Sequence, residues 1–433
     1  MPGEILSAPR LALTRETVEE LSRQRQEPEW LRAVRRRAFE AFERLPIPDQ
    51  HTEGWRRTNL RGLPIDAVDP LGGSDAPVVP RAHDALSEQA GATLFEFGRG
   101  IPVHQGSGHR VQVLELQSAL QDPDLAARIE KHFSTVVQPH SDKFTALHYA
   151  FFNAALVVHV PRGQRSDAPI WINHDFGNVH TLLIADDESE VTVVEDYRGG
   201  ASGIASGVVE QVVGANAHVR YVQLQRWAAD VWSFSWQRAH LGRDASLKTL
   251  NVALGARTAR NTVQVVLDGR GSQADLLGVV DGHGRQYVDF QTLQEHFGDA
   301  TRSDLVIHNA LRDRSSANFT GLIRINTSAH QTESSQEQKN ILLSERSKAD
   351  SDPKLEILNN DVIRCTHGAA VGPVDQEMIF YLESRGLDQA TAEQLIVEGF
   401  FQSTLKKLGL PRVEEALWSA IAEHEAVLKS ANA

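Results

Sequence analysis

The stretch "GANAHVRYVQLQ" (residues 214–225) joins a turn of small and polar residues to a short strand whose side chains alternate between apolar and polar. The same combination returns in turns that begin at Gly242, Gly269 and Gly298, so the starting positions from Gly214 onward are almost evenly spaced. A turn and a strand that recur at a nearly constant interval are typical of a β-solenoid, in which inward side chains pack on those of the next coil. The stretch therefore favours a solenoid.

Alternating strands extend this pattern from about Ala150 to "LEILNNDVI" (residues 355–363), which the alternation predicts to be a strand. Half-steps of the repeat begin at Asp313 and at Ser328. A β-sandwich with evenly spaced turns is the alternative architecture, and the spacing alone leaves it open.

Helical patterns precede the repeat. Thr14 can cap a first helix, and Pro28 fits the first turn of a second helix that runs to about Leu45. The arginines of "RAVRRRAF" (residues 32–39) fall between apolar residues at helical spacing, which predicts that they form the solvated face of this helix. With a linker and short strands, these helices make up an N-terminal region that we expect over residues 1–145.

Helical patterns also follow the repeat. Asp375 can cap a helix that stops at Gly386, and Pro411 fits the first turn of the last helix. The sequence thus predicts a mainly β protein with a β-helix core over residues 146–373 and a C-terminal helical domain over residues 374–433.

Composition limits the possible functions. The net charge of −13 argues against electrostatic binding of nucleic acid or an anionic membrane as the main function. The single cysteine, Cys365, rules out a disulfide within the chain and fits a reducing compartment. The N-terminus carries no signal pattern, and the longest strongly apolar stretch, "AALVVHV" (residues 154–160), is far too short to span a membrane. We therefore expect a cytoplasmic protein.

Common catalytic motifs are missing from the sequence. It has no phosphate-binding loop of the Gly-x-x-x-x-Gly-Lys-Ser/Thr type, no Gly-x-Ser-x-Gly elbow and no His-Glu-x-x-His helix. His174 and His180 lie near Asp175 and could suggest a cupin-like metal centre, but their spacing matches no ligand pattern. The sequence therefore offers none of these common routes to catalysis.

One enzymatic alternative stays open, because β-solenoids also host enzymes that cleave polysaccharides. Such enzymes need clustered acids or a basic catalytic residue along one face of the solenoid. The segment "DGHGRQYVDF" offers Asp281, Arg285 and Asp289. The alternative function is thus a cytoplasmic β-helix enzyme that acts on carbohydrate or another small substrate.

Cys365 and His367 are the remaining candidates for chemistry. If "DVIRCTHG" (residues 361–368) is a strand, the two side chains lie on the same face with Cα atoms about 6.6 Å apart. A thiolate and an imidazole so placed can bind one soft metal ion. Two ligands do not complete a site, however, and a buried cysteine beside a histidine that ends a strand is the alternative.

Three segments of the chain resemble the SufB/SufD family of iron–sulfur cluster assembly scaffolds. Residues 354–400 are similar to the C-terminal signature of the family, with its His-Gly-Ala step and its Tyr-Leu-x-Ser-Arg-Gly run. Residues 142–172 resemble the entry to the core domain, and "EGWRRTNLRGL" (residues 53–63) resembles the N-terminal Trp-Arg-x-Thr motif. The chain resembles the SufD branch more than SufB, which is expected to carry additional cysteines.

The resemblance implies a right-handed parallel β-helix and a scaffold that is not an enzyme. It implies pairing with a SufB-like subunit through the β-helix cores and docking of a SufC-like ATPase. Cys365 and His367 would lie at the partner interface and share an iron or a transient iron–sulfur cluster with the partner, so that no cofactor is stably bound. An isolated chain could form a homodimer through the same solenoid edges. The residues that the resemblance assigns to partner binding are Asp375, Phe380, Tyr381, Ser384, Arg385, Gly386 and Phe400.

Overall fold

A computed structural model describes most of the chain. The described residues are 13–65, 68, 85–97, 111–174, 177–199 and 202–432. Among them, none of the helices combines the length and the apolar character that a membrane span requires.

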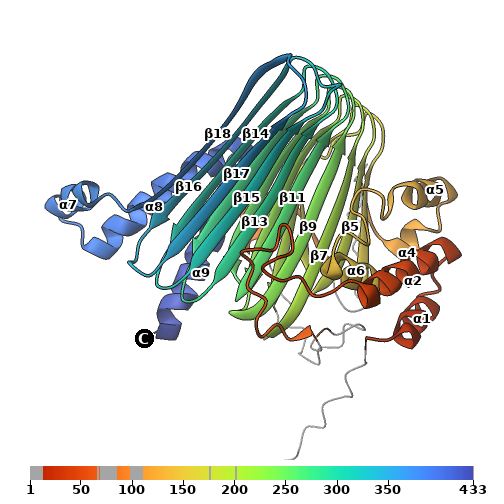
Figure 1. The fold of residues 1–433 in the computed structure, drawn as a ribbon, viewed down its shortest axis with the longest axis horizontal. Coiled ribbons are helices and arrows are strands. Elements are labelled where there is room, and N and C mark those ends of the chain that lie inside the picture. Colours follow the sequence, from red (N-terminus) through yellow and green to blue (C-terminus); the bar gives the residue numbers. More distant parts are fainter. Residues whose placement is uncertain are drawn as a thin grey trace, which may run out of the picture.

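Two nine-stranded sheets face each other and form the body of the protein (Figure 1). The strands of the first sheet are, in spatial order, β1 (Thr93–Phe97), β4 (Ile170–His174), β6 (Glu190–Gly199), β8 (His218–Trp227), β10 (Ser246–Gly255), β12 (Gln273–Gly282), β14 (Arg302–Leu311), β16 (Thr332–Leu342) and β18 (Val362–Pro373). The strands of the second sheet are β2 (Gln112–Glu115), β3 (Ala154–Val160), β5 (Asn178–Ala185), β7 (Ser202–Val213), β9 (Asp230–Leu241), β11 (Thr258–Leu267), β13 (Tyr287–His296), β15 (Ser316–Ile325) and β17 (Lys348–Ile357).

Strand pairing confirms the predicted parallel β-helix. From β3 onward, successive strands alternate between the two sheets, and each strand up to β16 pairs in parallel with the strand one coil later, whereas β2 pairs antiparallel with β3 in the second sheet. In the centre of the solenoid, Ser246 pairs with Gln273, and Gln273 pairs with Arg302. Arg302 pairs in turn with Glu333, which is a longer step along the chain than either of the two before it. The coils thus follow the predicted spacing in the centre and lengthen towards the C-terminal end.

The glycines that mark the repeat stack on one another at one edge of the solenoid. A Cβ atom at Gly298 would lie 2.7 Å from the carbonyl carbon of Gly269, and one at Gly269 would overlap the backbone of Gly242. Since real Cβ atoms do not approach backbone so closely, these turns need a residue without a side chain. The close stacking explains why the sequence repeats glycine at this interval.

One predicted strand is wrong in extent. The segment over residues 355–363 is not one strand, because β17 ends at Ile357 and β18 begins at Val362. Between them, the side-chain amide of Asn359 donates to the carbonyl oxygens of Asn326 and Ala329, at 2.7 and 2.8 Å. An asparagine that satisfies carbonyls of the preceding coil favours a turn over a continuous strand.

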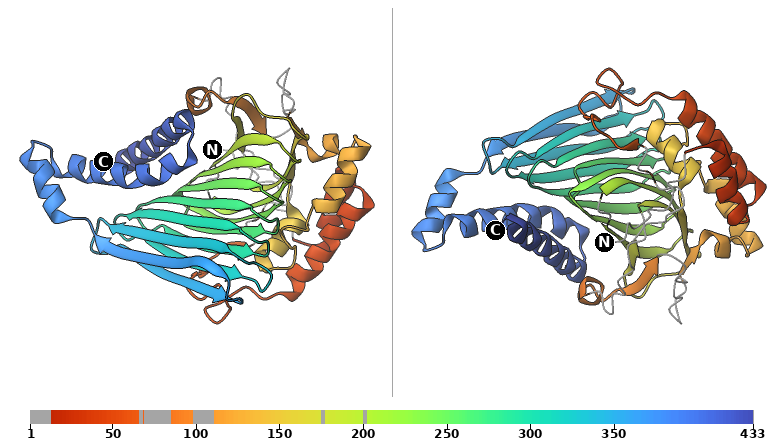
Figure 2. Two further views of the ribbon diagram at one scale, coloured as in Figure 1. Left: turned by 90° about the horizontal axis from the view of Figure 1, so that it is seen from above. Right: turned by 90° about the horizontal axis from the view of Figure 1, so that it is seen from below.

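N-terminal helices cover the outer face of the second sheet (Figures 1 and 2). Thr14 caps the first helix as predicted, since its hydroxyl accepts a hydrogen bond from the backbone N–H of Thr17 at 3.3 Å. Pro28 is the N-cap residue of the second helix. The helices are α1 (Arg15–Gln24), α2 (Glu29–Arg44), α3 (Ala85–Gln89), α4 (Leu116–Ala119), α5 (Pro123–His132) and α6 (Lys143–Phe151), and of these α3 packs with the C-terminal helices instead.

The basic stretch on α2 differs from its prediction. Arg37 is exposed, but Arg35 is fully buried and forms an ion pair with buried Glu27, with Nη2 and Oε1 2.7 Å apart. Arg35 also donates to the carbonyl oxygens of Ala150 and Phe152 at the end of α6. Helical spacing alone did not reveal this, because a charged residue can enter a core when every donor finds a partner.

C-terminal helices cover part of the outer face of the first sheet. They are α7 (Gln376–Ser384), α8 (Gln389–Leu405), the 3₁₀ turn Lys406–Leu408 and α9 (Pro411–Asn432). Phe401 of α8 and Leu417 of α9 are fully buried against side chains such as Leu250 and Val279 of the sheet. Helix α7 extends beyond the end of the solenoid (Figure 2). The boundaries of the three predicted regions, at 145/146 and 373/374, stay predictions.

Candidate functional site

The predicted metal ligands lie on β18, the last strand of the first sheet. Cys365 pairs in register with Ser334 and His367 with Gln336, and both of these β16 residues are buried. Because paired residues of neighbouring strands lie on the same face of a sheet, Cys365 and His367 both belong to the inward face. The register follows a bulge near the start of β18, where Ile363 is the extra residue.

The surroundings of the two side chains differ. Cys365 is half-buried and packs against a small apolar cluster of Ile323, Ile325 and Ala329. This burial raises the pKa of the Cys365 thiol. The neutral thiol is therefore the stable form in the isolated chain, and a metal ion would have to displace its proton. His367 is exposed.

The two donors do not form a complete metal site on their own. Within the described part of the chain, no group of three or more His, Cys, Asp or Glu side chains gathers closely enough to hold a metal ion. A tetrahedral centre needs four ligands. Cys365 and His367 can therefore supply two ligands at most, and further donors must come from elsewhere.

The apolar core of the solenoid is left uncapped beside these residues. We call β17 and β18 together the open coil, because each is the last strand of its sheet. Leu355 of β17 pairs in register with Ile323, which is fully buried, yet Leu355 itself is 37% exposed. Val371 on the inward face of β18 is also exposed, and so is Ile363 at 65%. The open coil is thus an apolar surface with two unpaired strand edges.

The interior directly beneath β18 is polar. In β14 the inward residues include Leu305 and Ile307, whereas the β16 residues in register with them are Gln336 and Gln338. Gln336 is buried, and its amide donates to the carbonyl oxygen of Lys354 in β17 at 3.2 Å. These two β16 residues are thus polar where the paired β14 residues are apolar, and buried polar side chains such as Gln225 and Asn251 also occur inside earlier coils.

Most of the predicted partner-binding residues lie on or beside α7. Asp375 caps the helix by accepting from the backbone N–H groups of Glu377 and Met378, and Gly386 follows its end with a positive φ of 94°. Phe380 is 71% exposed and Tyr381 is 55% exposed. They form a protruding aromatic surface.

Two further predicted residues hold this surface in place. The Arg385 guanidinium lies 5.2 Å from the centre of the Tyr381 ring and donates to its hydroxyl at 3.3 Å. The hydroxyl of Ser384 donates to the carbonyl oxygen of Tyr381 at 2.6 Å. Arg385 and Ser384 thus restrict the orientation of Tyr381.

Phe400 is placed differently from the other predicted residues. Its ring stacks on His308 of β14 with centroids 4.2 Å apart, and its carbonyl oxygen accepts a hydrogen bond from Nδ1 of His308 at 3.0 Å. The ring packs within this chain and anchors α8 to the solenoid. Burial lowers the pKa of His308, so its neutral form is stabilised.

The histidines considered for a cupin-like centre lie in two separate environments. His174 is buried beside Glu195, at 3.4 Å, and stacks on Tyr197. The Nε2 atom of His180 lies 3.1 Å from the buried carboxylate of Glu210, on the outer side towards the N-terminal helices. Asp175 lies outside the described residues. The structure gives no support for a shared metal ion here.

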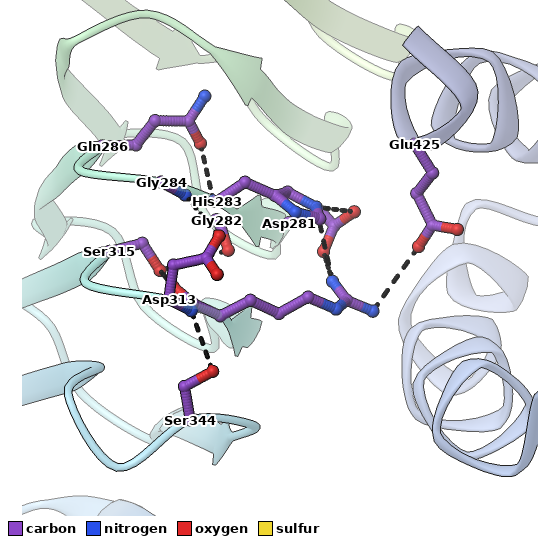
Figure 3. A network of polar contacts seen from close by, with 10 residues as sticks. Asp281, Gly282, His283, Gly284, Gln286, Asp313, Ser315, Ser344 and Glu425 are labelled. Atoms are coloured by element: carbon purple, nitrogen blue, oxygen red, sulfur yellow. Dashed lines mark hydrogen bonds and ion pairs between the residues drawn. The ribbon is translucent and has the colours of Figure 1, made fainter. Parts of the chain in front are cut away.

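The acidic residues considered for sugar cleavage are both engaged in ion pairs. Asp281 is buried and bonds with Arg312 and His283, in a network that joins the turn after β12 to Glu425 of α9 (Figure 3). Burial alone would raise the pKa of Asp281, but the hydrogen bond from His283 and the charge of Arg312 outweigh it and hold the pKa below its ordinary value. A general acid needs the opposite shift.

Asp289 is likewise fully engaged in contacts with other residues of the protein. It is buried, pairs with Arg260, and accepts hydrogen bonds from Thr58 at 2.6 Å and Asn318 at 2.7 Å. Of the three candidates, only Arg285 is exposed. This arrangement disfavours the enzymatic alternative, because neither carboxylate is open to a substrate.

Sequence reasoning missed the uncapped core of the open coil. The available signal was that Leu355 and Ile357 continue the inward apolar positions in the last strand of the second sheet, with no further strand in the sequence pattern of that sheet to cover them. It also missed Met378, which is exposed beside the aromatic pair of α7.

Comparison with known proteins agrees with this architecture. The family model described as "SUF system FeS cluster assembly, SufBD core domain" matches residues 172–400, more than half of the chain. The iron–sulfur cluster assembly protein SufD of Bacillus subtilis is 29% identical, with 95% of this chain and 98% of the relative covered. SufB of the same organism is 26% identical, with 92% and 90% covered. A SufBD family protein of Mycobacterium bovis is 32% identical, with 66% and 74% covered. The chain therefore belongs to the SufB/SufD family of iron–sulfur cluster assembly proteins and is SufD-like.

Proposed function

We propose that this chain is a non-catalytic scaffold subunit that pairs with a SufB-like subunit through the open coil and docks a SufC-like ATPase on α7. Family membership supports a role in iron–sulfur cluster assembly. The observation that carries the pairing is the uncapped core: Leu355, Ile357 and Val371 are exposed at positions whose partners in the preceding coil are buried. We place this assembly in the cytoplasm, because a single cysteine fits a reducing compartment.

The open coil is suited to a second solenoid as its partner. Both of its strands have unpaired N–H and C=O groups along one edge, which can pair with an incoming strand. A partner with its own terminal coil would extend both sheets at once and cover the exposed apolar side chains. An isolated chain offers the same surface to a second copy, so we expect a homodimer when no SufB-like subunit is present.

Such pairing would bring the ligands that the site lacks. Cys365 and His367 lie on the inward face of β18, so the partner's terminal coil would face them directly. We infer that His367 binds an iron or a nascent cluster as cargo, and that the partner supplies most of the thiolates. Because burial raises the pKa of the Cys365 thiol, His367 is the readier donor near neutral pH.

The surface of α7 supports a second, separate docking site. Phe380 and Tyr381 are exposed there, and Arg385 orients Tyr381 by stacking and by a hydrogen bond. Exposed, pre-oriented aromatic residues are common anchors of protein interfaces. Helix α7 stays connected to the chain body through buried Ile379 and Val374, so a bound ATPase could transmit motion to the nearby open coil.

Co-purification tests the proposal directly. The chain should be produced with a SufB-like and a SufC-like subunit and isolated through a tag on this chain alone, under reducing conditions. We expect both partners to co-elute in a stable complex and the chain alone to show no hydrolytic activity on polysaccharides. The absence of any stable complex, or robust sugar cleavage by the chain, would refute the proposal.

A further inference from the structure

A groove with several arginines runs along one edge of the solenoid. Its lining residues all precede β18 in the sequence. It has a volume of about 870 Å³, which lies in the range of small-molecule sites. Its floor is the row of turns that lead from the first sheet to the second, with Asp230 at the start of β9, Arg257 before β11 and Arg285 before β13. Its wall carries Asn59 and Arg61 from the N-terminal segment.

The wall is firmly anchored to the solenoid. Trp55 is buried. The Arg260 guanidinium lies over the Trp55 ring, 3.8 Å from the centre of that ring. Thr58 donates to Asp289 at 2.6 Å, and the hydroxyl of Tyr287 donates to the carbonyl oxygen of Arg57 at 2.9 Å. The Trp-Arg-x-Thr motif therefore holds the following residues, including Arg61, in a fixed position over the turns.

Several positive side chains of the groove have no acidic partner in the part of the chain that the structure describes. Arg61, Arg257 and Arg285 are exposed, and none of the ion pairs found within the described ranges involves them. By contrast, Arg260 and Arg312 nearby pair with buried aspartates.

Two carboxylates, Asp230 and Asp313, line the same groove, so its three arginines outnumber its acidic side chains by one. Asp313 accepts a hydrogen bond from the backbone N–H of Gly284 at 2.8 Å, which fixes its carboxylate to the turn. Asp230 is exposed. In a chain with a net charge of −13, the groove is thus a local positive site.

We propose that this groove binds a small ligand that carries a diphosphate group. A guanidinium offers a planar fork of donors that matches phosphate oxygens, and three of them around one hollow can contact two phosphate groups at once. The Arg257 guanidinium lies 5.6 Å from the centre of the Trp232 ring, a contact that limits its mobility. This inference does not rest on the proposed scaffold function.

Calorimetric titration of the full chain with inorganic pyrophosphate tests the proposal. At low ionic strength we expect saturable binding to one site, weaker binding of inorganic phosphate, and a loss of affinity as salt is added. The variant with both Arg257→Gln and Arg285→Gln should lose about tenfold in affinity for each arginine removed. Since both side chains are exposed, the variant should keep its circular dichroism spectrum.

The matched control is Arg270→Gln, an exposed arginine in a turn outside the groove lining. It should bind pyrophosphate as the unchanged chain does. The proposal is overturned if the unchanged chain shows no saturable binding, or if the control variant loses as much affinity as the groove variant.

Discussion

Ile357 pairs in register with Ile325 one coil earlier, and Ile325 is fully buried whereas Ile357 is 44% exposed. The two residues occupy equivalent inward positions, so the difference arises only because no coil follows β17. A solenoid normally protects its last coil with a polar or helical cap. Here the C-terminal helices cover the side of the first sheet and leave the end of the solenoid open.

The first prediction concerns this exposed core. Ile357→Asp should weaken pairing with a SufB-like subunit by at least tenfold, because it places a charge within the apolar surface of the open coil. The variant should fold normally, since the side chain is already partly in water. Binding can be measured by biolayer interferometry with the purified partner. Ile47→Asp, at an exposed apolar position that is not part of the open coil, is the control and should bind normally.

The second prediction ranks the two donors of β18. His367→Ala should impair maturation of cluster-containing enzymes in cells while the protein stays folded, and Cys365→Ser should have a milder effect. The reason is that Cys365 is half-buried as a neutral thiol, whereas His367 is exposed. Activity of a cluster-dependent reporter enzyme measures the effect. A larger loss in Cys365→Ser than in His367→Ala would reverse the ranking.

The third prediction separates two aromatic residues that the family resemblance groups together. Phe380→Ala should weaken ATPase docking without changing thermal stability, because its ring is exposed. Phe400→Ala should instead lower the thermal midpoint by about 2–4 °C, through loss of its stacking on His308. Differential scanning fluorimetry and a pull-down with the ATPase distinguish the two. If Phe380→Ala leaves docking intact, the contact does not involve this face of α7.

The fourth prediction concerns pH. Burial lowers the pKa of His296 to about 4, and burial is also the main reason that the pKa of His424 lies at about 4. An unfolded chain takes up a proton on each of these histidines near its ordinary pKa of about 6.5, whereas the folded chain does not. The free energy of unfolding should therefore fall as the pH drops from about 6.5 to 4.

Substitution of His296 checks this effect. His296→Gln should make the loss of stability over this pH range shallower in denaturant titrations, because one of the two groups no longer titrates. His51→Gln removes an exposed histidine and should leave the slope as it is. An identical slope in His296→Gln would show that this residue does not contribute to the acid sensitivity.

The fold could be predicted because its cause lies in local sequence. Glycines such as Gly269 and Gly298 must recur where turns stack closely, so the period of the coils is visible in the chain. The starts of two helices could also be predicted, since Thr14 and Asp375 cap these helices with their own side chains. Arg35 shows the limit: its burial depends on Glu27 and on carbonyl groups at the end of α6, which only the tertiary structure brings together.

The candidate site was predictable only in part. The strand period places Cys365 and His367 on one face, and β18 confirms this. That the core beneath them would be uncapped depends on where α8 and α9 dock, which no local pattern reveals. The stacking of Phe400 on His308 joins residues 92 positions apart in the sequence. It could not be predicted either, because it also depends on where α8 docks.

The reactivity of Cys365 tests the central claim most directly. Because Cys365 is the only cysteine of the chain, its rate of alkylation by a maleimide reports on the open coil alone. We predict that a SufB-like partner slows this alkylation at least tenfold for the unchanged chain, and that the same partner concentration, chosen so that the weakened Ile357→Asp variant stays unbound, leaves alkylation of that variant unaffected. A complex that forms while Cys365 reacts as fast as in Ile357→Asp would contradict the account, because the partner would then bind elsewhere.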